Sequence, residues 1–415
     1  MLSLKSLSLD LLGAHPAHRL AGFALLSASV PLSHNNPWAA LWTTPCILAA
    51  SVLIAWGAES AQFFVAQGFA LAILAWMQTL PEFAVEAVLA WHRQTDLLLA
   101  NLTGALRLLT GLAWPLIYLT AAIVHRRREH QPLRLITLDL HHSVEVLALI
   151  PPLLYALLIW WKANLHFYDA CILICFYAAY LFLLTRLPPQ EKEAIEDLGT
   201  VPRNIVKAPR GKRIAAIFAC FVVGGALVYF TAEPFLGSIM AVATAMGVPT
   251  FIVIQWFAPV VSEFPELAST FYFARQRDKA PVAIMNIASS NINQWTLLVA
   301  MLPVVFSMSH GSITGFNLDA EQQSELLLTI AQSFAAFALM LNMEVAWWEA
   351  LLMFILFAGQ FLLPLLLGEE SRRWITVAFF VWTAGEFAAI ALRRKIPLAL
   401  ANFLETWRDH VGRRS

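Results

Sequence analysis

Runs of about 20 mostly apolar residues follow one another along almost the whole chain, and a helix of that length spans the hydrocarbon core of a bilayer. Hydrophobic residues make up 59% of the 415 residues. Charged residues make up only 13%, whereas a typical soluble domain has about 25%. The runs do not alternate apolar and polar residues, as the strands of a membrane barrel would. The sequence therefore predicts an all-α polytopic membrane protein.

The apolar runs divide into about 11 candidate spans. These are residues 38–57, 62–91, 96–124, 142–161, 168–185, 214–231, 237–274, 280–308, 324–342, 346–367 and 374–392. The second and the seventh are too long for one straight helix. The second contains Pro81 near its centre, and the seventh contains Pro259 and Pro265. Proline removes a backbone donor and clashes with the preceding turn. We therefore expect both spans to be broken at the midplane of the membrane.

The distribution of Lys and Arg predicts the orientation. The connections 125–140, 186–213 and 275–279 and the C-terminal tail are rich in Lys and Arg, and these spans place all four on one side. The positive-inside rule makes that side cytoplasmic. On the opposite side, 309–323 has no Lys or Arg, while Arg372 and Arg373 are the main exception. We expect a multi-pass protein of the bacterial inner (plasma) membrane, with the N-terminus outside and the C-terminus in the cytoplasm.

Two parts of the chain share a pattern. "TLPEFA" (79–84) aligns with "EFPELA" (263–268) at an offset of 184 (263 minus 79), and "NLTGALRLL" (101–109) aligns with "NIASSNINQ" (286–294) at an offset of 185 (286 minus 101). An odd number of spans in each half gives the two copies opposite topology, and inverted repeats with interrupted helices are an architecture of secondary transporters.

The repeat divides the chain into five parts. We expect an interfacial segment (1–37), a first repeat of five spans (38–185), a cytoplasmic linker (186–213), a second, inverted repeat of five spans (214–367), and an extra span with a basic cytoplasmic tail (368–415). The linker also contains mixed charges that favour one short amphipathic helix around 190–198. The connection between the first two spans of the second repeat is expected at 232–236, where Glu233 is the one charged residue.

The two aligned segments resemble the α-repeats of the sodium/calcium exchanger family, in the calcium/cation antiporter superfamily. Each repeat of that family carries a Ser-x-Pro-Glu type motif on one helix and an Asn-x-x-Gly-Ser-Asn type motif on the next. The resemblance covers about 75–110 and 255–300, and "SSNINQWTLL" looks closest to a prokaryotic sodium:proton exchanger-like branch. It implies that Thr79, Glu82, Glu266 and Ser290 match ion-coordinating positions and that Asn101 and Asn286 lie near the ion site.

The residue chemistry is consistent with an ion site. A carboxylate in mid-membrane costs roughly 3 kcal/mol or more, so it is usually paired, solvated or protonated. Glu82 and Glu266 each follow a helix-breaking proline, and a hard cation prefers oxygen ligands such as carboxylates. We therefore expect these two residues to be the metal ligands. The alternatives are carboxylates at helix ends, and hydroxyls of Thr79 and Ser290 that hydrogen-bond their own helix backbone.

The chain also departs from the family pattern. Glu263 stands where the second repeat usually has Ser or Thr, and Leu109 and Gln294 stand where exchangers commonly place Asn or Asp. Arg107 adds a positive charge. These changes weaken the cage of six to eight oxygens that Ca²⁺ needs. Glu263 and Glu266 would repel each other if both were ionised, so the pair could hold either a proton or a metal ion. Glu263 could instead form an ion pair with Arg107.

Two further acidic residues are candidates for a proton pathway or gate, together with Arg107. Glu145 lies four residues after His141, a spacing that suits an interfacial cap, a proton relay or a metal site. Glu86 lies one turn after Glu82 and either lines the same pathway or faces the mouth of the cavity.

The leading functional prediction is a secondary antiporter that exchanges Na⁺ or Ca²⁺ for H⁺ by alternating access. Alternatives are a Ca²⁺/Na⁺ exchanger proper, a channel or sensor without transport, and an intramembrane metal-dependent enzyme that uses His141 and Glu145, although the chain has no HExxH motif. We expect no enzyme activity, no cofactor and, at a net charge of zero, no nucleic-acid partner. The expected partners are the lipid bilayer and transported inorganic cations, and homo-oligomerisation is left open.

Overall fold

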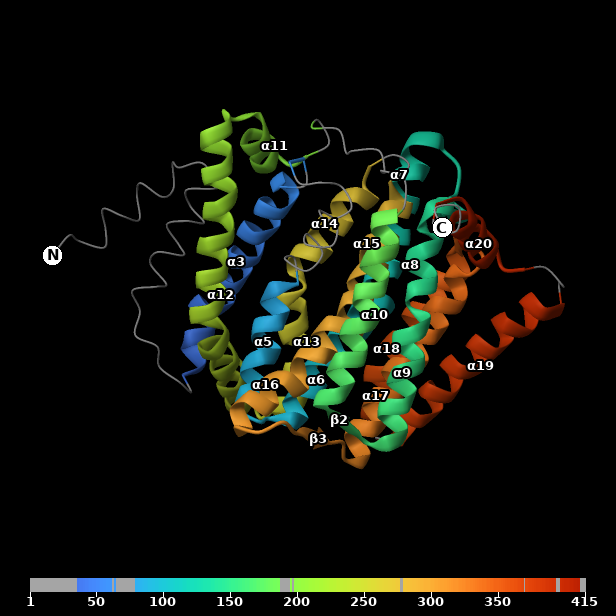
Figure 1. Ribbon diagram of the computed structural model, residues 1–415. Helices are drawn as coiled ribbons and strands as arrows, with labels where there is room; N and C mark the ends of the chain where they lie inside the picture. The colour runs from blue at the N-terminus through green and yellow to red at the C-terminus, as the bar shows by residue number, and fades with distance from the viewer. Residues whose placement is uncertain are drawn as a thin grey trace. The chain divides into compact units, whose positions relative to one another are not determined.

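The protein is helical, with four short strands (Figure 1). The computed structural model describes residues 36–61, 63–64, 79–186, 195, 198–276, 279–368, 370–392 and 396–410. Within these residues, nine helices are long and apolar enough to cross a membrane, or ten if one bent pair counts as a single span. The prediction of an all-α polytopic membrane protein is confirmed. The expected interfacial segment 1–37 and the first half of the expected span 62–91 lie almost entirely outside the described residues.

The chain divides into two compact units. Unit 1 comprises Met1–Val88 and Gln190–Pro265, and unit 2 comprises Leu89–Pro189 and Glu266–Ser415. The helices of unit 1 are η1 (Pro37–Ala39), α3 (Ala40–Ala61), most of α5 (Leu80–Trp91), α11 (Thr200–Lys207), α12 (Arg210–Met246) and α13 (Thr250–Ser262). The division cuts α5 near its end and α14 (Phe264–Ala274) near its beginning.

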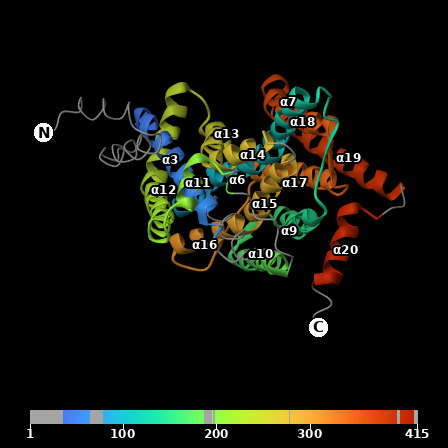
Figure 2. The same cartoon turned by 90° about the horizontal axis from the view of Figure 1, so that it is seen from above.

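Helices α3 and α12 lie side by side in unit 1 (Figures 1 and 2). Gly224 on α12 makes their close approach possible, because a Cβ atom there would lie 2.7 Å from a side-chain carbon of Ile54. Two buried polar contacts also join the helices: the Cys46 Sγ lies 3.2 Å from the Thr231 hydroxyl, and the Thr43 and Ser238 hydroxyls lie 2.9 Å apart. Close packing and polar contacts are what hold helices together in lipid.

The structure corrects one predicted connection. The segment 232–236 is not a loop, because α12 continues through Pro234 to Met246 as a single helix of 37 residues. The chain turns instead at Gly247, whose left-handed φ of 67° suits glycine, and α13 begins after Pro249. Glu233 is therefore an exposed residue of a helix. The helix expected around 190–198 lies largely outside the described residues, and α11 occupies 200–207.

Unit 2 contains two copies of one helical pattern. In the first, α6 (Thr95–Leu108), a π-helical segment η2 (Leu109–Ala113) and α7 (Trp114–Glu129) follow without a gap. In the second, α15 (Ala280–Asn293), a π-helical segment η5 (Gln294–Leu298) and α16 (Val299–His310) do the same. The second π segment begins 185 residues after the first (294 minus 109), which agrees with the sequence offset. The two repeats therefore share a backbone irregularity as well as a motif.

Four short strands show how these copies are related. Strand β1 (Leu135–Thr137) pairs antiparallel with β4 (Glu344–Ala346), and β2 (Asn164–His166) pairs antiparallel with β3 (Gly315–Asn317). Strands β1 and β3 follow equivalent helices of the two repeats, as do β2 and β4. A twofold axis that exchanges the two repeats replaces β1 by β3 and β4 by β2. It therefore maps the β1–β4 pair onto the β3–β2 pair, as observed. The prediction of two inverted repeats is confirmed.

The remaining helices complete unit 2. They are η3 (Leu140–His142), α8 (Ser143–Ala148), α9 (Ile150–Lys162), α10 (Phe167–Arg186), α17 (Ala320–Met340), α18 (Trp347–Leu367), α19 (Ser371–Leu392) and α20 (Leu398–His410). The predicted extra span is α19, which packs against α17 and α18. Helix α17 begins with a capping box in which Asp319 and Gln322 satisfy each other's backbone N–H groups.

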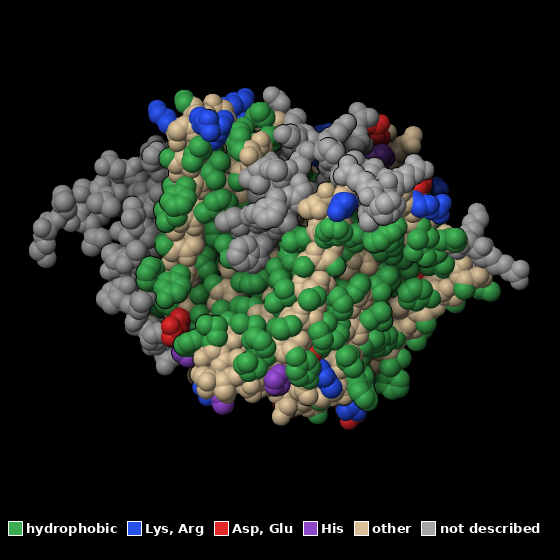
Figure 3. Space-filling model, in the orientation of Figure 1, with side chains coloured by type: hydrophobic (Ala, Val, Ile, Leu, Met, Phe, Trp, Pro, Cys, Tyr) green, Lys and Arg blue, Asp and Glu red, His purple; other side chains and the backbone are tan. Residues whose placement is uncertain are grey.

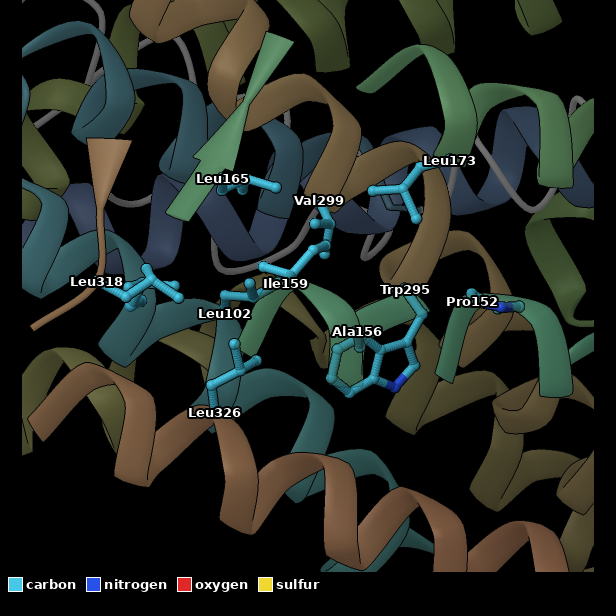
Figure 4. Close-up of a pocket in the computed structure, with 11 residues that line it drawn as sticks. Leu102, Pro152, Ala156, Ile159, Leu165, Leu173, Trp295, Val299, Leu318 and Leu326 are labelled. Carbon is cyan, nitrogen blue, oxygen red and sulfur yellow. The ribbon is translucent and has the colours of Figure 1, made fainter. Parts of the chain in front are cut away.

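The surface of unit 2 suits a bilayer. Figure 3 shows hydrophobic side chains across the middle of the face formed by α9 and α10, with charged side chains towards its ends. Among them are Leu154, Trp161 and Phe182, all more than half exposed. Inside the unit, an apolar cavity of about 20 Å³ is lined by residues such as Leu102, Trp295 and Leu326 (Figure 4). A cavity of that size without polar partners does not hold water, so it is a packing defect.

Candidate cation site

Glu266 lies at the beginning of α14, directly after a break in the helical path. Helix α13 ends at Ser262, and Glu263 has φ −85° and ψ 0°, outside the α region. The break follows from Pro265, which has no N–H to donate to a preceding turn but is well tolerated in the first turn of a new helix. The predicted interruption of the seventh span is therefore present at the expected residues.

Two polar contacts join α14 to α15. The Ser290 hydroxyl donates a hydrogen bond to a carboxylate oxygen of Glu266. The second contact lies one turn after Glu266 on α14 and one turn before Ser290 on α15, where the Asn286 amide nitrogen is 3.2 Å from the Thr270 hydroxyl. Glu266 and Ser290 are both buried. The structure thus brings together, within unit 2, three of the residues that the sequence singled out.

The corresponding residues of the first repeat are also buried. Thr79 precedes α5, and Glu82 and Glu86 lie on it with fully buried side chains. Glu86 occupies the position that Thr270 has in the second repeat, so an acid replaces a hydroxyl there. Glu263 is 1% exposed. Carboxylates buried in membrane helices must be protonated, paired or bound to a cation.

The next helix of each repeat carries the remaining predicted residues. Asn101 is fully buried on α6. Leu109 and the fully buried Gln294 are the first residues of the two π segments. π segments inside α-helices are frequently found at functional sites. The departures from the family pattern therefore coincide with an irregular backbone in both repeats.

Arg107 lies in a buried polar network of unit 2. Its guanidinium is 2.6 Å from a carboxylate oxygen of Glu325 on α17, and Arg372 on α19 binds the other oxygen of the same carboxylate. Arg107 also lies 3.3 Å from the Gln360 side-chain oxygen, and Gln360 donates to Gln332 at 2.6 Å. The alternative ion pair of Arg107 with Glu263 stays a prediction.

Three members of this network were not predicted from the sequence: Glu325, Gln332 and Gln360. All three carried a usable signal, because each is a polar residue within a predicted span: Glu325 and Gln332 in 324–342, and Gln360 in 346–367. A further signal was Arg372, the main exception to the charge rule. Gln332 also explains Gly111, since a Cβ atom at that glycine would lie 2.8 Å from the Gln332 amide and 2.3 Å from the Phe357 ring.

The predicted pair of His141 and Glu145 takes a different form. The His141 side chain lies outside the described part of the chain, and Glu145 Oε1 is 3.5 Å from Nδ1 of the neighbouring His142. Among the described residues, no group of three or more His, Cys, Asp or Glu side chains could hold a metal ion.

Inverted repeats with interrupted helices and buried carboxylates define the protein as a membrane transporter of the inverted-repeat class. Within that class, the chain belongs to the sodium/calcium exchanger family. The family profile, described as sodium/calcium exchanger protein, matches residues 36–186 and again residues 216–366, once in each repeat. The resemblance inferred from the two motifs is confirmed.

Solved structures show the same fold. The chain is similar to a structure of the H⁺/Ca²⁺ exchanger CAX, with 28% identity, a TM-score of 0.83, and 98% of this chain and 99% of that chain covered. Native YfkE matches with 16% identity, a TM-score of 0.58, and 88% of this chain and 99% of that chain covered. The sodium-calcium exchanger NCX_Mj matches with 17% identity, a TM-score of 0.52, and 83% of this chain and 98% of that chain covered. None of the curated protein sequences matches.

Family membership fixes the coarse function. The protein is a multi-pass membrane transporter of the cation exchanger family, and its homologues are exchangers, which are not enzymes.

Proposed function

We propose that the protein is a secondary antiporter that exchanges Ca²⁺ or Na⁺ for H⁺ by alternating access. The observation that carries this proposal is the buried Glu266 carboxylate with its Ser290 hydrogen bond, together with a buried glutamate, Glu82, at the equivalent position of the first repeat. Each carboxylate is tolerated in the membrane when it holds a proton or a cation. Competition between these two ligands is what couples their opposite movements.

The oxygen chemistry favours a hard cation. Glu266 offers carboxylate oxygens and Ser290 a hydroxyl oxygen, and Pro265 has no N–H to donate to the backbone carbonyl of Val261. Acidic residues are also numerous in both repeats, since Glu86 and Glu263 add to the two principal carboxylates. High negative charge suits a divalent ion, and CAX, the solved structure with 28% identity, is an H⁺/Ca²⁺ exchanger. We therefore place Ca²⁺ first and Na⁺ second.

Purified protein in liposomes tests the proposal. An imposed pH gradient is expected to drive uptake of Ca²⁺, or of Na⁺, that saturates with cation concentration. Glu82→Gln and Glu266→Gln are each expected to reduce this uptake at least tenfold, because a glutamine neither ionises nor binds a proton. Glu321→Gln is the matched control, since that carboxylate is exposed in the first turn of α17.

The assay separates the alternatives. Ca²⁺ uptake driven by a Na⁺ gradient but not by a pH gradient would indicate a Ca²⁺/Na⁺ exchanger proper. Uptake that never saturates would indicate a channel. Full activity of both glutamine variants would overturn the proposed site.

A further inference from the structure

Helix α20 (Leu398–His410) is the last described helix of the chain and belongs to unit 2. Its 13 residues extend about 20 Å, whereas the hydrocarbon core of a bilayer is about 30 Å thick. It carries none of the residues of the candidate cation site. Its role must therefore differ from that of the spanning helices.

The position of α20 is fixed by contacts with the ends of two spans. It packs against η3 and α8, where the span Ser143–Lys162 begins. The Ala399 backbone N–H donates a 3.0 Å hydrogen bond to the carbonyl of Leu341, directly after the span Ala320–Met340. Strand β1 precedes η3 and strand β4 follows Leu341, so α20 lies at the end of unit 2 that carries the β1–β4 pair.

The direction of α20 differs from that of the spans. Figure 2 shows α20 along its length, whereas α9 and α10, which run up the page in Figure 1, are seen close to end-on. The helix therefore lies crosswise to the spanning helices, at the level where two of them end. That is the place and direction of a helix in the interface between bilayer and water.

The side chains of α20 divide into faces. Ala399 is fully buried. Leu400, Leu404 and Trp407 follow at spacings of four and three residues, so they form one stripe, and they are 37%, 41% and 43% exposed. Glu405, on the side of the helix next to this apolar stripe, is exposed to solvent. An exposed apolar stripe beside a charged face is typical of helices that lie in a membrane interface.

The apolar stripe continues the lipid-facing surface of unit 2. Leu140 on η3, the element against which α20 packs, is 57% exposed, and Trp347 at the beginning of α18 is 54% exposed. Trp347 lies at the same end of the unit, because its backbone N–H bonds the carbonyl of Arg134 just before β1. Tryptophan is enriched where a membrane meets water, and Trp407 adds a second one at this level. A bilayer that surrounds the spans would therefore reach the apolar stripe as well.

The charge around α20 indicates the kind of lipid. From position 393 to position 415 the sequence has six Lys or Arg and two Asp or Glu, a formal net charge of +4 (6 minus 2) with His410 neutral. Clusters of Lys and Arg that follow a membrane span or lie on an amphipathic helix bind anionic headgroups. The predicted orientation places this end in the cytoplasm, and the cytoplasmic leaflet has a negative surface potential. The basic residues are Arg393, Arg394, Lys395, Arg408, Arg413 and Arg414.

We infer that α20 is an interfacial helix that binds the bilayer surface. The apolar stripe lies at the boundary between headgroups and acyl chains, and the basic residues around it favour anionic phospholipids. Because α20 is bound to Leu341 and packs against α8, this contact holds the ends of two spans at the membrane surface. The inference does not depend on which ions the protein exchanges.

Spin labels on the full-length protein in liposomes test this placement. The native cysteines are replaced, and a nitroxide is attached to a single cysteine in Leu404→Cys or, as the matched control on the charged face, in Glu405→Cys. Collision with oxygen, which concentrates in lipid, is compared with collision with a neutral, water-soluble nickel complex. In liposomes of phosphatidylcholine mixed with phosphatidylglycerol, the ratio of oxygen to nickel collisions should be roughly fivefold higher at position 404 than at position 405. Leu400→Cys should repeat the result of position 404, which shows that one substitution has not disturbed the helix.

Two results would overturn the inference. Equal ratios at positions 404 and 405 would mean that the apolar stripe lies in water. Protection of position 404 from both reagents would mean that protein, such as a second copy of the chain, covers it.

The lipid composition tests the charge preference. In pure phosphatidylcholine the ratio at position 404 should fall about twofold, and high salt should remove this difference between the two lipid compositions, because salt screens the charges. The same ratio with and without phosphatidylglycerol would contradict the preference for anionic headgroups.

Discussion

Ser290 shows what a single hydroxyl contributes to the candidate site. It donates a hydrogen bond to the buried Glu266 carboxylate, and a hydrogen bond to a charged group contributes about 1.5–3 kcal/mol. Ser290→Ala removes this donor and also a neutral oxygen ligand. We expect the apparent KM for the transported cation to rise roughly 10- to 100-fold, measured as initial uptake into liposomes over a range of cation concentrations.

Ser307→Ala provides the control on the same helical run. Ser307 hydrogen-bonds the backbone of Thr314 in a connection and does not contact a carboxylate in any described interaction. Its KM should match wild type. An unchanged KM for Ser290→Ala would mean that the hydroxyl is not a ligand.

Individual residues were predictable where the repeat marked them. Glu266 and Ser290 could be assigned to one site because the resemblance matches both to ion-coordinating positions, although the repeat itself places Ala105 at the position equivalent to Ser290 (290 minus 185). Glu325 could not be assigned to Arg107, because the two are 218 residues apart (325 minus 107) and lie on helices that share no motif. Tertiary contacts between unrelated helices leave no periodic signal in the sequence.

At the scale of helices, the buried carboxylate of Glu325 joins α6, α17 and the extra helix α19 through Arg107 and Arg372. Removing the charged partner of a buried ion pair costs about 3–5 kcal/mol, because the remaining charges stay buried. We therefore expect Glu325→Gln to lower the melting temperature of the detergent-solubilised protein markedly. Glu321→Gln, one turn earlier on the same helix and exposed, should leave it unchanged. Equal melting temperatures for both variants would argue against the idea that this network stabilises the packing of α19.

Most helices follow directly from the apolar runs, and the exceptions have local physical causes. The segment 232–236, predicted as a loop, is helical because α12 accommodates Pro234 and continues to Met246. The π segments at Leu109 and Gln294 had no sequence signal, since an extra residue in one turn leaves composition and hydropathy unchanged. Helix α20 lies within the predicted basic tail, and its 13 residues are too few to span a bilayer.

At the scale of the whole molecule, the strand pairs constrain the topology of unit 2. Strands β1 and β4 lie together, as do β2 and β3. The predicted orientation places the connections containing β1 and β4 in the cytoplasm and those containing β2 and β3 outside, so each pair stays on one side. If the predicted number of spans between two paired strands were wrong by one, the prediction would place the two strands on opposite sides of the membrane. Arg372, the exception to the charge rule, is compatible with this orientation because its guanidinium is held in an ion pair with Glu325, a carboxylate that it shares with Arg107.

Cysteine labelling in intact cells tests the orientation. The four native cysteines, Cys46, Cys171, Cys175 and Cys220, are first replaced, since two of them are exposed. Single cysteines then replace Ser312, in the exposed connection before β3, and Gln131, in the exposed connection before β1. A membrane-impermeant maleimide added to intact cells should label position 312 and not position 131, and both should react once the membrane is permeabilised. The opposite pattern would reverse the orientation but preserve the strand pairs. Labelling of both positions in intact cells would contradict the inverted topology itself, because the two connections follow equivalent helices of the repeats and must then lie on opposite sides of the bilayer.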